Sequence, residues 1–374
     1  MSKMIMMIPA RAGSKRVKNK NLRLLSGNPL ISYVINTCKE VSKELDIPVY
    51  VNSDCEDVLY LAEELGVNTY KRKPEFASDT ATNDEFMLDF MENTDSDHVL
   101  QVLPTSPFIT KEDIKTFIGI SADSDTVVSV KDEQIGCVYE NTPLNFSKGK
   151  KNPPSQEMTP IKVYTTSLMC WNTETFKKNM SELGSAYHGG NGKTVYHTLK
   201  GWSTIDIDTE DDFLLAENIA QMIPFQDKYK PFYYERGDHA DSFVPRVLKD
   251  DGLSGGTADE VNKTVVNVKD LMETNSVDKS WFHTLVNTEN NSCTIVNQLP
   301  GEGNRRHYHA KWNEWWYILR GTWDFEIEGV VHAIKEGDLV FIEKGNKHHI
   351  TATGDTIASR LAVSRYDVEH IYKR

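Results

Sequence analysis

The chain has 374 residues, of which 39% are hydrophobic and 26% charged, and its formal net charge at pH 7 is -13. This composition is that of a folded globular protein, and the length suffices for two domains with separate cores. No apolar run approaches the ~20 residues that a membrane span needs, and the acidic balance argues against general nucleic-acid binding, which requires a basic face.

The cysteines and the first residues bear on the cellular compartment. Five cysteines, odd in number and without a CxxC pair, fit reduced thiols rather than a disulfide framework or a zinc cluster. Residues 1–8 are apolar but too short for the core of a signal peptide, and they run directly into a basic loop. We therefore expect a cytoplasmic protein with no membrane partner.

The first predicted element is a buried strand over 4–8, followed by a turn with Pro9 and Gly13. Between Arg11 and Arg23 there are six basic residues and no acid. Backbone N–H groups in a glycine-containing loop after a strand, together with Lys and Arg countercharge, suit a triphosphate. On composition alone, a solvated basic turn is an equally good interpretation.

Beyond this loop, predicted helices alternate with predicted strands, which indicates a parallel sheet with right-handed crossovers. The helices are predicted at 29–41, 57–65, 84–91 and 111–120, and the strands at 49–54, 98–103, 126–130 and 164–171. A further strand is predicted at 203–208, followed by a helix through Glu217. Ligands bind beyond the carboxyl ends of such strands, where the basic loop, Ser53, Asp54 and the turn 104–107 all fall.

The composition changes after residue 224. Residues 225–262 are rich in aromatics, Pro, Asp and Gly, which is typical of a linker or docking segment. Short β-rich runs then follow at 264–268, 292–298, 314–319, 323–327, 338–342 and 358–363, and they predict an all-β sandwich or barrel. The predicted organisation is thus a first domain over 1–224, a linker over 225–262 and a second domain over 263–374.

Four ordered blocks of sequence are similar to the motifs of one enzyme family. The blocks are 8–16 with 20–22, then 72–81, 103–107 and 203–212. No Walker-type loop and no dinucleotide-binding glycine fingerprint accounts for the first block. The set resembles the CMP-sugar synthetases, the acylneuraminate and related 2-keto-sugar-acid cytidylyltransferases, which implies a Rossmann-like, mostly parallel α/β nucleotidyltransferase.

This resemblance implies a reaction and roles for particular residues. CTP would react with the anomeric hydroxyl of a sialic-acid-like sugar acid, giving a CMP-sugar and pyrophosphate. The implied catalytic residues are Arg11, Lys15 and Lys20, which hold the triphosphate, and Asp206 and Asp208, which carry Mg²⁺. The implied nucleotide-binding residues are Ala10, Ala12, Gly13, Ser14, Asn21, Arg72, Thr80 and Asn83, of which Asn21, Arg72 and Asn83 contact cytosine or ribose.

The residues themselves support the metal role and limit the choice of substrate. Asp206 and Asp208, two apart on a strand, present both carboxylates on one face, as oxygen ligands for Mg²⁺ require. Without the other blocks, an acidic strand end or a helix cap would be the better interpretation. Leu103 stands where the sialic-acid enzymes usually have Gln, and 161–166 replaces their Arg-Pro-Asn-Gly run. Two alternatives therefore stay open: another acceptor, such as a phosphonate, and the use of GTP in place of CTP.

The second domain resembles the cupins, which implies an all-β barrel. The residues that match the two cupin motifs are His307, His309, Glu314, Gly321, Gly337, Gly345 and His348. The resemblance makes His307, His309, Glu314 and His348 ligands of a divalent transition metal, and three imidazoles with one carboxylate suit Fe, Mn, Ni, Cu or Zn. Lone histidines on strands are more often structural, but six of the 11 histidines follow residue 306. His307 and His309 are expected to share one face of a strand, and His349 would point to the opposite face from His348.

The ligands of a cupin do not reveal its activity, because the fold serves oxygenases, isomerases, epimerases and binding modules. The fusion of a cupin to a nucleotidyltransferase resembles the domain arrangement of the guanylyltransferases with a C-terminal cupin isomerase. This resemblance implies that the cupin modifies or recognises the same sugar acid. We therefore predict a bifunctional enzyme that binds CTP and a small sugar acid and forms a homo-oligomer, a dimer or tetramer. The alternative is a ligand-sensing protein with a vestigial transferase, against which the retained Arg11, Lys15, Asp206 and Asp208 argue.

Overall fold

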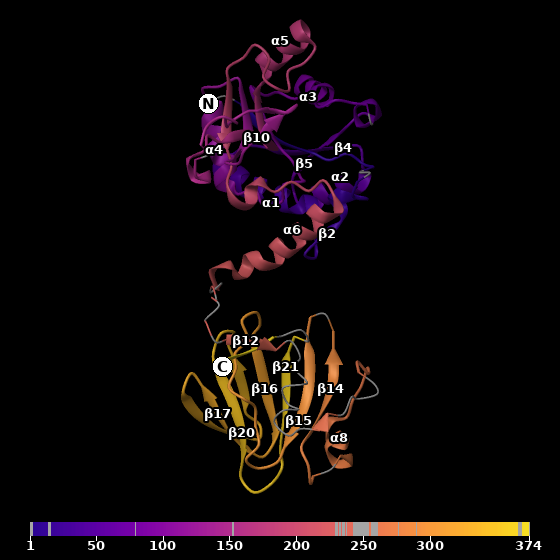
Figure 1. Cartoon of the computed structure of the whole chain (residues 1–374). Helices are drawn as coiled ribbons and strands as arrows, with labels where there is room; N and C mark the ends of the chain where they lie inside the picture. Colours follow the sequence, from indigo (N-terminus) through magenta and orange to yellow (C-terminus); the bar gives the residue numbers. More distant parts are fainter. Residues whose placement is uncertain are drawn as a thin grey trace. The chain divides into compact units, whose positions relative to one another are not determined.

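The computed structural model describes residues 3–13, 16–78, 80–151, 153–228, 231, 233, 236, 238–241, 254–255, 261–275, 277–288, 290–365 and 369–373. The chain divides into two compact units, Met1–Lys228 and Tyr229–Arg374, each with its own core (Figure 1). The predicted linker falls mostly outside the described residues, so the domain boundaries stay a prediction. Among the described helices, none has the length and apolar character that crossing a membrane demands.

The first unit is built on a seven-stranded sheet in the order β11-β7-β10-β6-β1-β4-β5. Its strands are β1 (Met4–Pro9), β4 (Val49–Ser53), β5 (Asn68–Lys71), β6 (His98–Val102), β7 (Thr126–Glu133), β10 (Ile161–Asn172) and β11 (Thr194–Thr198). β10 runs antiparallel to both neighbours, and the other neighbouring pairs are parallel. The predicted mostly parallel α/β sheet is confirmed.

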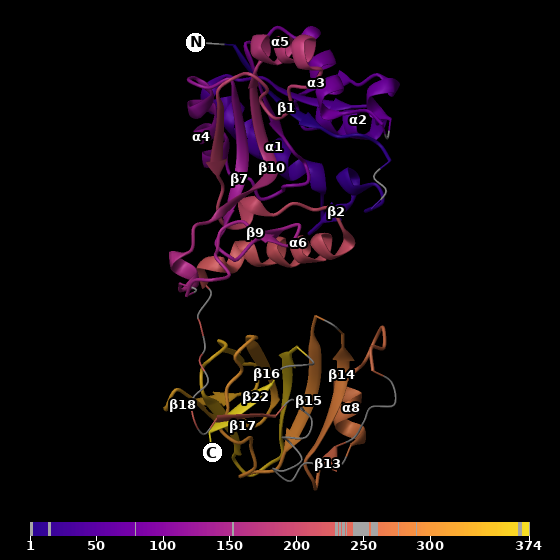
Figure 2. The ribbon, with the colours of Figure 1, turned by 45° about the horizontal axis from the view of Figure 1, so that its top comes forward.

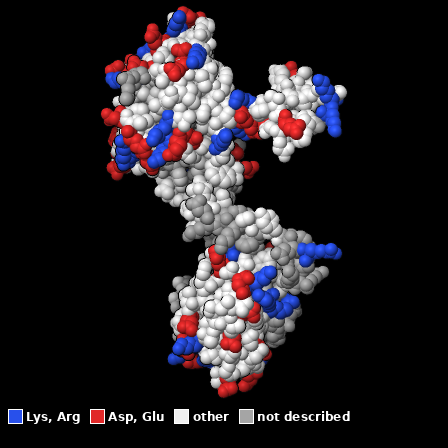
Figure 3. All heavy atoms as spheres, turned by 90° about the vertical axis from the view of Figure 1, so that its left-hand side faces the viewer, with Lys and Arg blue, Asp and Glu red and all other residues white. Residues whose placement is uncertain are grey.

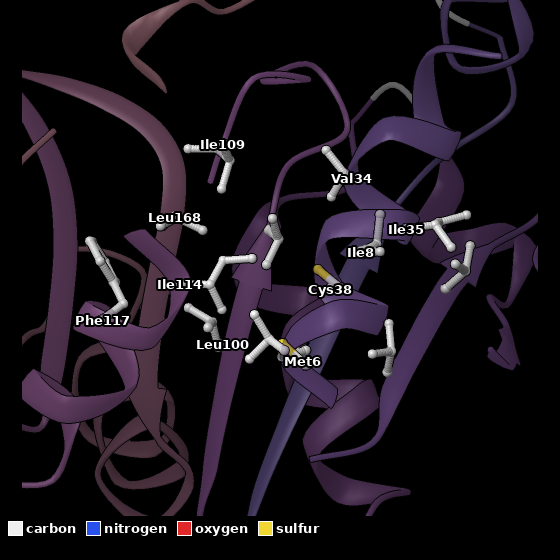
Figure 4. Packing of buried hydrophobic residues seen from close by; sticks show 14 of the residues in the cluster. Met6, Ile8, Val34, Ile35, Cys38, Leu100, Ile109, Ile114, Phe117 and Leu168 are labelled. Atoms are coloured by element: carbon white, nitrogen blue, oxygen red, sulfur yellow. The ribbon is translucent and has the colours of Figure 1, made fainter. Parts of the chain in front are cut away.

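Helices cover both faces of this sheet. They are α1 (Leu30–Leu45), α2 (Glu56–Glu64), α3 (Asn83–Glu92), α4 (Lys111–Ser121), α5 (Thr173–Leu183) and α6 (Glu210–Met222). α1, α2 and α4 pack with Met6, Ile8 and Leu100 on one face, as Figure 4 shows for α1 and α4. α3 and α5 pack on the other face with Met7 and Val99. Because both faces are covered, the central strand β1 is apolar throughout.

The helix starts follow from local sequence. Three helices begin with a capping box in which a threonine and an acid satisfy each other's backbone N–H groups: Thr82 with Glu85, Thr110 with Asp113, and Thr209 with Asp212. Helix α5 was not among the predicted elements. Its N-cap is Asn172, whose side chain accepts the backbone N–H of Thr175 over 3.0 Å. Two small hairpins, β2 (Leu24–Leu25) with β3 (Asn28–Pro29) and β8 (Val138–Tyr139) with β9 (Thr142–Pro143), complete the unit.

The predicted strand over 203–208 is wrong. Gly201–Thr204 forms a 3₁₀ turn, with Gly201 in the left-handed region at φ 58°, and residues 205–208 are irregular chain outside the sheet. A backbone hydrogen bond of 2.9 Å from the Ile207 N–H to the Thr105 carbonyl fixes this segment beside the end of β6. Ile207 itself is fully buried in the cluster beneath α6. The segment therefore lies at the carboxyl edge of the sheet without pairing along it.

Exposed charges of the first unit are mixed in sign. On the face drawn in Figure 3, Lys and Arg side chains are interspersed with Asp and Glu. Lys111 and Lys115, for example, both pair with Glu44 of α1. Exposed pairs of this kind contribute little to stability, so the apolar layers on the two sheet faces are the main stabilising feature.

The second unit consists of mostly antiparallel sheets (Figure 2). Six strands follow the order β13-β14-β15-β21-β16-β19, three the order β18-β17-β20, and β12 pairs with β22. The strands are β12 (Asp238–Asp241), β13 (Ser254–Gly255), β14 (Trp281–Asn287), β15 (Ser292–Gln298), β16 (Glu314–Arg320), β17 (Thr322–Ile327), β18 (Val330–Lys335), β19 (Leu339–Ile342), β20 (His348–Thr353), β21 (Ala358–Ser364) and β22 (His370–Lys373).

One apolar cluster joins the six-stranded and three-stranded sheets. It contains Trp316 of β16 and Trp323 and Phe325 of β17, all fully buried. The predicted all-β character of this region is confirmed. The predicted strand at 264–268 is wrong, because this stretch leads into the helix α8 (Val268–Thr274), whose first turn is capped by the side chain of Asn267.

The backbone passes so closely at Gly303 that only glycine fits. Gly303 pairs with Thr351 of β20 through an isolated bridge. A Cβ at Gly303 would lie 1.8 Å from the carbonyl oxygen of Ile350, also in β20. We expect Gly303→Ala to destabilise the second unit by about 1–3 kcal/mol or more, because backbone must move. Urea unfolding of the full chain measures this.

The matched control is Gly119→Ala in α4, where a Cβ meets nothing within 4 Å. This change should stabilise the first unit by up to about 1 kcal/mol through helix propensity. Equal unfolding curves for the two variants would contradict the close approach at Gly303.

Candidate functional sites

The basic loop begins where β1 ends, and β4 holds its first residues. The Ala10 N–H donates to the Asn52 carbonyl over 3.0 Å, and the Ala12 N–H donates to the Asp54 carboxylate over 2.8 Å. Gly13 has φ 77°, a conformation that glycine adopts without strain. Two of the predicted site residues, Ser14 and Lys15, lie outside the described residues.

The far end of the loop meets the segment 205–208. The Lys20 ammonium donates to the Ile207 carbonyl and lies 3.4 Å from the Asp208 carboxylate. The Arg16 guanidinium lies 2.9 Å from the same carboxylate oxygen. Two predicted parts of the site, the basic loop and the acidic pair, are therefore in contact in the structure.

A small hollow of about 50 Å³ opens beside the loop. It is lined by residues 11–13 and 19–22 and by Cys55 and Val58 at the start of α2. The buried Asn21 lines it and donates from its side-chain amide to the Arg11 carbonyl over 3.4 Å. Asn21 thus ties the two ends of the loop together.

Asp206 has an unsatisfied carboxylate oxygen. Its Oδ1 atom is buried and has no hydrogen-bond partner among the described residues. Burial raises the pKa of Asp206, a hydrogen bond from the Thr105 side chain lowers it, and the negative charge of Asp208 raises it again. A half-buried carboxylate with an unused oxygen beside a second carboxylate fits a hard divalent cation such as Mg²⁺, which would stabilise both charges.

Arg72 is buried behind the loop at the end of β5. Its guanidinium donates to the side-chain and main-chain oxygens of Asn52 over 2.8 and 3.1 Å and stacks 4.2 Å above the Phe86 ring. Burial lowers the pKa of Arg72 to about 10, while Asp54 raises it and Arg11 lowers it. Arg72 therefore lies near Arg11, and its hydrogen bonds go to the end of β4.

Thr80 and Asn83 lie at the entrance to α3. The Thr80 hydroxyl is 3.2 Å from that of Ser78, and the Arg11 guanidinium donates to the Ser78 carbonyl over 3.2 Å. The Asn83 side chain is close enough to Tyr187 to lower the pKa of its phenol. Ser78 is thus connected to the basic loop, and Asn83 lies near Tyr187.

Tyr187 is a site residue that the sequence did not reveal. The Asp84 carboxylate accepts the backbone N–H groups of Ala186 and Tyr187 over 2.6 and 2.8 Å, which fixes the chain here. The pKa of Tyr187 is raised to about 12, chiefly by burial. The negative charges of Asp84 and Asp206 also raise this pKa, and Asn83 lowers it. The pKa of Tyr187 therefore responds to a predicted nucleotide-binding residue and to a predicted metal ligand, and no local motif marks Tyr187.

A bulge in β10 brings the two departures from the family pattern together. The pairing of β10 with β7 shifts between Tyr164 and Met169, and Thr166 has φ 54°. The Leu103 N–H donates to the Ser167 carbonyl over 3.0 Å, and the Ser106 hydroxyl lies 2.9 Å from that of Ser167. Leu103 and the altered run 161–166 thus border one edge of the site.

In the second unit, the four predicted metal ligands converge. Their exposed fractions lie between 0% for His348 and 7% for Glu314. The ring centroid of His307 lies 5.0 Å from that of His309 and 4.4 Å from that of His348. The Glu314 Oε2 atom lies 3.3 Å from the Nε2 of His309 and 3.6 Å from that of His348. The predicted ligand set is one cluster.

Main-chain carbonyls orient all three imidazoles. The Nδ1 atoms lie within hydrogen-bond distance of carbonyl oxygens: His307 of Arg305 at 2.7 Å, His348 of Asn346 at 2.8 Å, and His309 of Glu369 at 3.0 Å. If each Nδ1–H donates there, the Nε2 atoms keep their lone pairs. Nε2 of His307 and of His348 is buried without a hydrogen-bond partner among the described residues. Such outer contacts are typical of metal-ligating histidines.

The electrostatics of the cluster favour a cation. Burial and the neighbouring histidines hold the pKa of His307 well below its usual value, so this imidazole is neutral and able to ligate. Burial would raise the pKa of Glu314, but the close imidazoles of His309 and His348 hold it well below its usual value. Burial would also lower the pKa of His309, but Glu314 outweighs it and raises that pKa. A positive charge is therefore stabilised beside Glu314.

The local context of these histidines differs from the prediction in one respect. His307 and His309 were expected on a strand, but this stretch is held by isolated bridges, His307 with His348 and Tyr308 with Ile371. The expected orientation of His349 is confirmed: its side chain is 34% exposed and lies 3.5 Å from Glu326.

Comparisons with known proteins agree with both resemblances. Residues 5–156 match the family model described as cytidylyltransferase, and residues 282–364 match the model described as cupin domain. The N-acylneuraminate cytidylyltransferase of Streptococcus agalactiae serotype V is 28% identical over 221 residues, which are 57% of this chain and 52% of the relative. The CMP-N,N'-diacetyllegionaminic acid synthase of Legionella pneumophila is 33% identical over 135 residues, 34% of this chain and 57% of the relative.

Among solved structures, a CMP:2-keto-3-deoxy-manno-octonic acid synthetase in complex with CTP superposes with a TM-score of 0.47 at 16% identity, over 59% of this chain and 100% of that chain. The chain spans about half the length of the curated relatives that it matches, 52% for the first. By the family models, residues 5–156 are thus similar to the cytidylyltransferases, and residues 282–364 are similar to the cupins.

Proposed function

We propose that the first unit joins CTP to a 2-keto sugar acid and releases pyrophosphate. The observation that carries this proposal is the buried, unused carboxylate oxygen of Asp206 next to Asp208, in contact with a basic loop at the end of β1. The names of the relatives, which specify an N-acylneuraminate and a legionaminic acid derivative, support a sugar acid as the acceptor.

Each part of the site has a role in this reaction. Asp206 and Asp208 would hold Mg²⁺, which supplies charge neutralisation for the phosphates when bound. Arg11, Lys15 and Lys20 would hold the triphosphate by charge and hydrogen bonds, with the backbone N–H groups of the loop. The sugar hydroxyl oxygen then forms a bond to the α-phosphorus and gives up its proton to solvent, while the bond to pyrophosphate breaks in line with it.

The edge formed by Leu103 and the bulge of β10 is proposed to select the acceptor. Leu103 lacks a side-chain hydrogen-bonding group, so polar recognition at this edge has to come from neighbours such as Ser106 and Ser167. The change affects the acceptor side and leaves the basic loop and the acidic pair unchanged. The transferase chemistry is therefore expected to persist with a sugar acid that differs from N-acetylneuraminate.

Pyrophosphate release with CTP and Mg²⁺, across a panel of nine-carbon and eight-carbon keto-sugar acids, tests this function. We expect turnover with CTP and one class of acid, and little with GTP. Equal turnover with GTP would refute the base specificity. The absence of turnover with every acid would refute the proposed acceptor class and move the search to phosphonates.

For the second unit we propose a divalent transition metal held by His307, His309, Glu314 and His348, and a role in modifying or recognising the same sugar acid. The support is the convergence of these donors and their fusion to the transferase. We also propose that the protein is cytoplasmic and forms a homo-oligomer. Metal analysis combined with oxygen uptake on the sugar and its CMP form separates an oxygenase from an isomerase or a binding module.

A further inference from the structure

We propose that His370 is a fifth protein ligand of the metal in the second unit, giving four imidazoles and one carboxylate. This inference rests on the metal site proposed above. His370 belongs to neither motif that predicted the other ligands. It lies on the last described strand, β22, more than 20 residues after His348.

The distances place His370 within the cluster. Its ring centroid lies 4.3 Å from that of His307, with the rings stacked at 29°, and 4.5 Å from that of His309, with the rings at 89°. Ligand atoms of His307, His309 and His370 lie within 4.8 Å of one another, and so do those of His309, Glu314 and His348. His309 is common to both groups, so the two groups form one continuous set of donors.

The main chain fixes this placement. Tyr308 and Ile371 exchange two backbone hydrogen bonds, of 3.1 and 3.0 Å. In an antiparallel pair the flanking residues lie opposite each other on a shared face, which sets His370 opposite His309. The Glu369 carbonyl, one residue before His370, accepts from the His309 Nδ1–H over 3.0 Å. One strand therefore both orients a ligand and presents another donor beside it.

Burial makes a purely structural role costly. His370 is 6% exposed, and its neighbours His307 and His309 are 2% exposed. Among the described residues, Nε2 of His307 and of His348 is buried without a hydrogen-bond partner, so both atoms lose hydration that no contact replaces. Coordination to one ion would compensate for this loss by using a lone pair of each ring.

A fifth ligand changes what the metal can bind. Three histidines and one glutamate leave two positions of an octahedron for outside ligands, whereas four histidines and one glutamate leave one. The site would then accept a single donor atom, such as a water or one carboxylate or hydroxyl oxygen, and would not chelate a substrate through two atoms. The imidazole-rich set also favours Co, Ni, Cu and Zn over Mn.

Cobalt loading of the full chain tests the proposal, with His370→Gln compared with His332→Gln as matched control. His332 is an exposed histidine on β18 of the same unit. With excess Mg²⁺ present to fill the proposed site at Asp206 and Asp208, we expect one Co²⁺ per chain in the wild type and the control. In folded His370→Gln, Co²⁺ affinity should fall about 10–100-fold, and visible absorption should intensify as the coordination number drops.

Several results would overturn the proposal. Folded His370→Gln with unchanged affinity and spectrum would leave His370 outside the coordination sphere, while the metal site itself would stand. Two ions per wild-type chain would split the donors into separate sites. No Co²⁺ bound by the wild type would refute the metal site as a whole. If His370→Gln does not fold, proton NMR of the Co²⁺-loaded wild type decides: four shifted, exchangeable imidazole N–H signals support the proposal and three overturn it.

Discussion

Asparagine in place of Asp206 is expected to lower kcat/KM of nucleotidyl transfer by about 10²–10³-fold or more and, at the same time, to stabilise the first unit at pH 7. Activity falls because a neutral amide does not replace a carboxylate as a Mg²⁺ ligand. Stability rises because burial chiefly raises the pKa of Asp206, and the charge of Asp208 adds to this effect. The ionised form is therefore disfavoured in the folded chain.

The pH dependence has a definite sign. A carboxyl whose pKa is higher in the folded than in the unfolded chain favours folding when protonated, and this contribution is lost as the pH rises through the folded pKa. The stabilisation by asparagine should thus be present at pH 7 and vanish below the unfolded value of 3.8. Urea unfolding of the Mg²⁺-free chain at several pH values measures it.

Asp208→Asn is the matched control for this experiment. Asp208 pairs with Arg16 and Lys20, so its replacement removes favourable contacts and should not stabilise the chain. It should still impair Mg²⁺-dependent pyrophosphate release. If folded Asp206→Asn keeps normal Mg²⁺-dependent turnover, Asp206 has no role in the reaction.

Removal of the metal from the second unit is expected to lower the unfolding temperature of that unit and leave the first unit unchanged. The buried donors around Glu314 form a site that exists only in the folded chain, so metal binding stabilises the fold by mass action. At a free metal concentration 100 times the Kd, the contribution is about 2.7 kcal/mol. Calorimetry of the full chain, with and without a transition-metal chelator, gives the shift.

Two variants on β20 sharpen this measurement. His348→Gln removes a fully buried donor and should abolish the chelator effect. His349→Gln changes the next residue, which faces Glu326, and should preserve the effect. A chelator shift that is equal in both variants would show that the metal binds elsewhere.

The sequence predicted those parts of the molecule in which local pattern and burial agree. The helix α1 and the strand β1 have one apolar pattern each, and both were found where expected. The ligands from His307 to Glu314 lie within eight residues, so their grouping is a local property. The segment 205–208 shows the limit: its alternation of Ile and Asp resembles a strand, but alternation does not reveal whether a neighbouring strand is there to pair with it.

Tyr187 and His370 were missed for a different reason. Tyr187 reaches the site because Asp84, from α3, holds its backbone. His370 reaches the metal ligands because Ile371 pairs with Tyr308. Both placements depend on contacts between distant parts of the chain, which spacing and composition do not encode.

The carbonyl groups that orient His307, His309 and His348 have a consequence for how this protein can diverge. Every amino acid offers the same main-chain oxygen, so substitutions at 305, 346 or 369 retain the acceptors. The residue types at these positions can therefore change during evolution while the imidazoles of the proposed metal site keep their orientation. An inserted or deleted residue in these short stretches would instead rotate the accepting carbonyl away from its imidazole. We therefore expect related sequences to differ here in residue type but not in the number of residues.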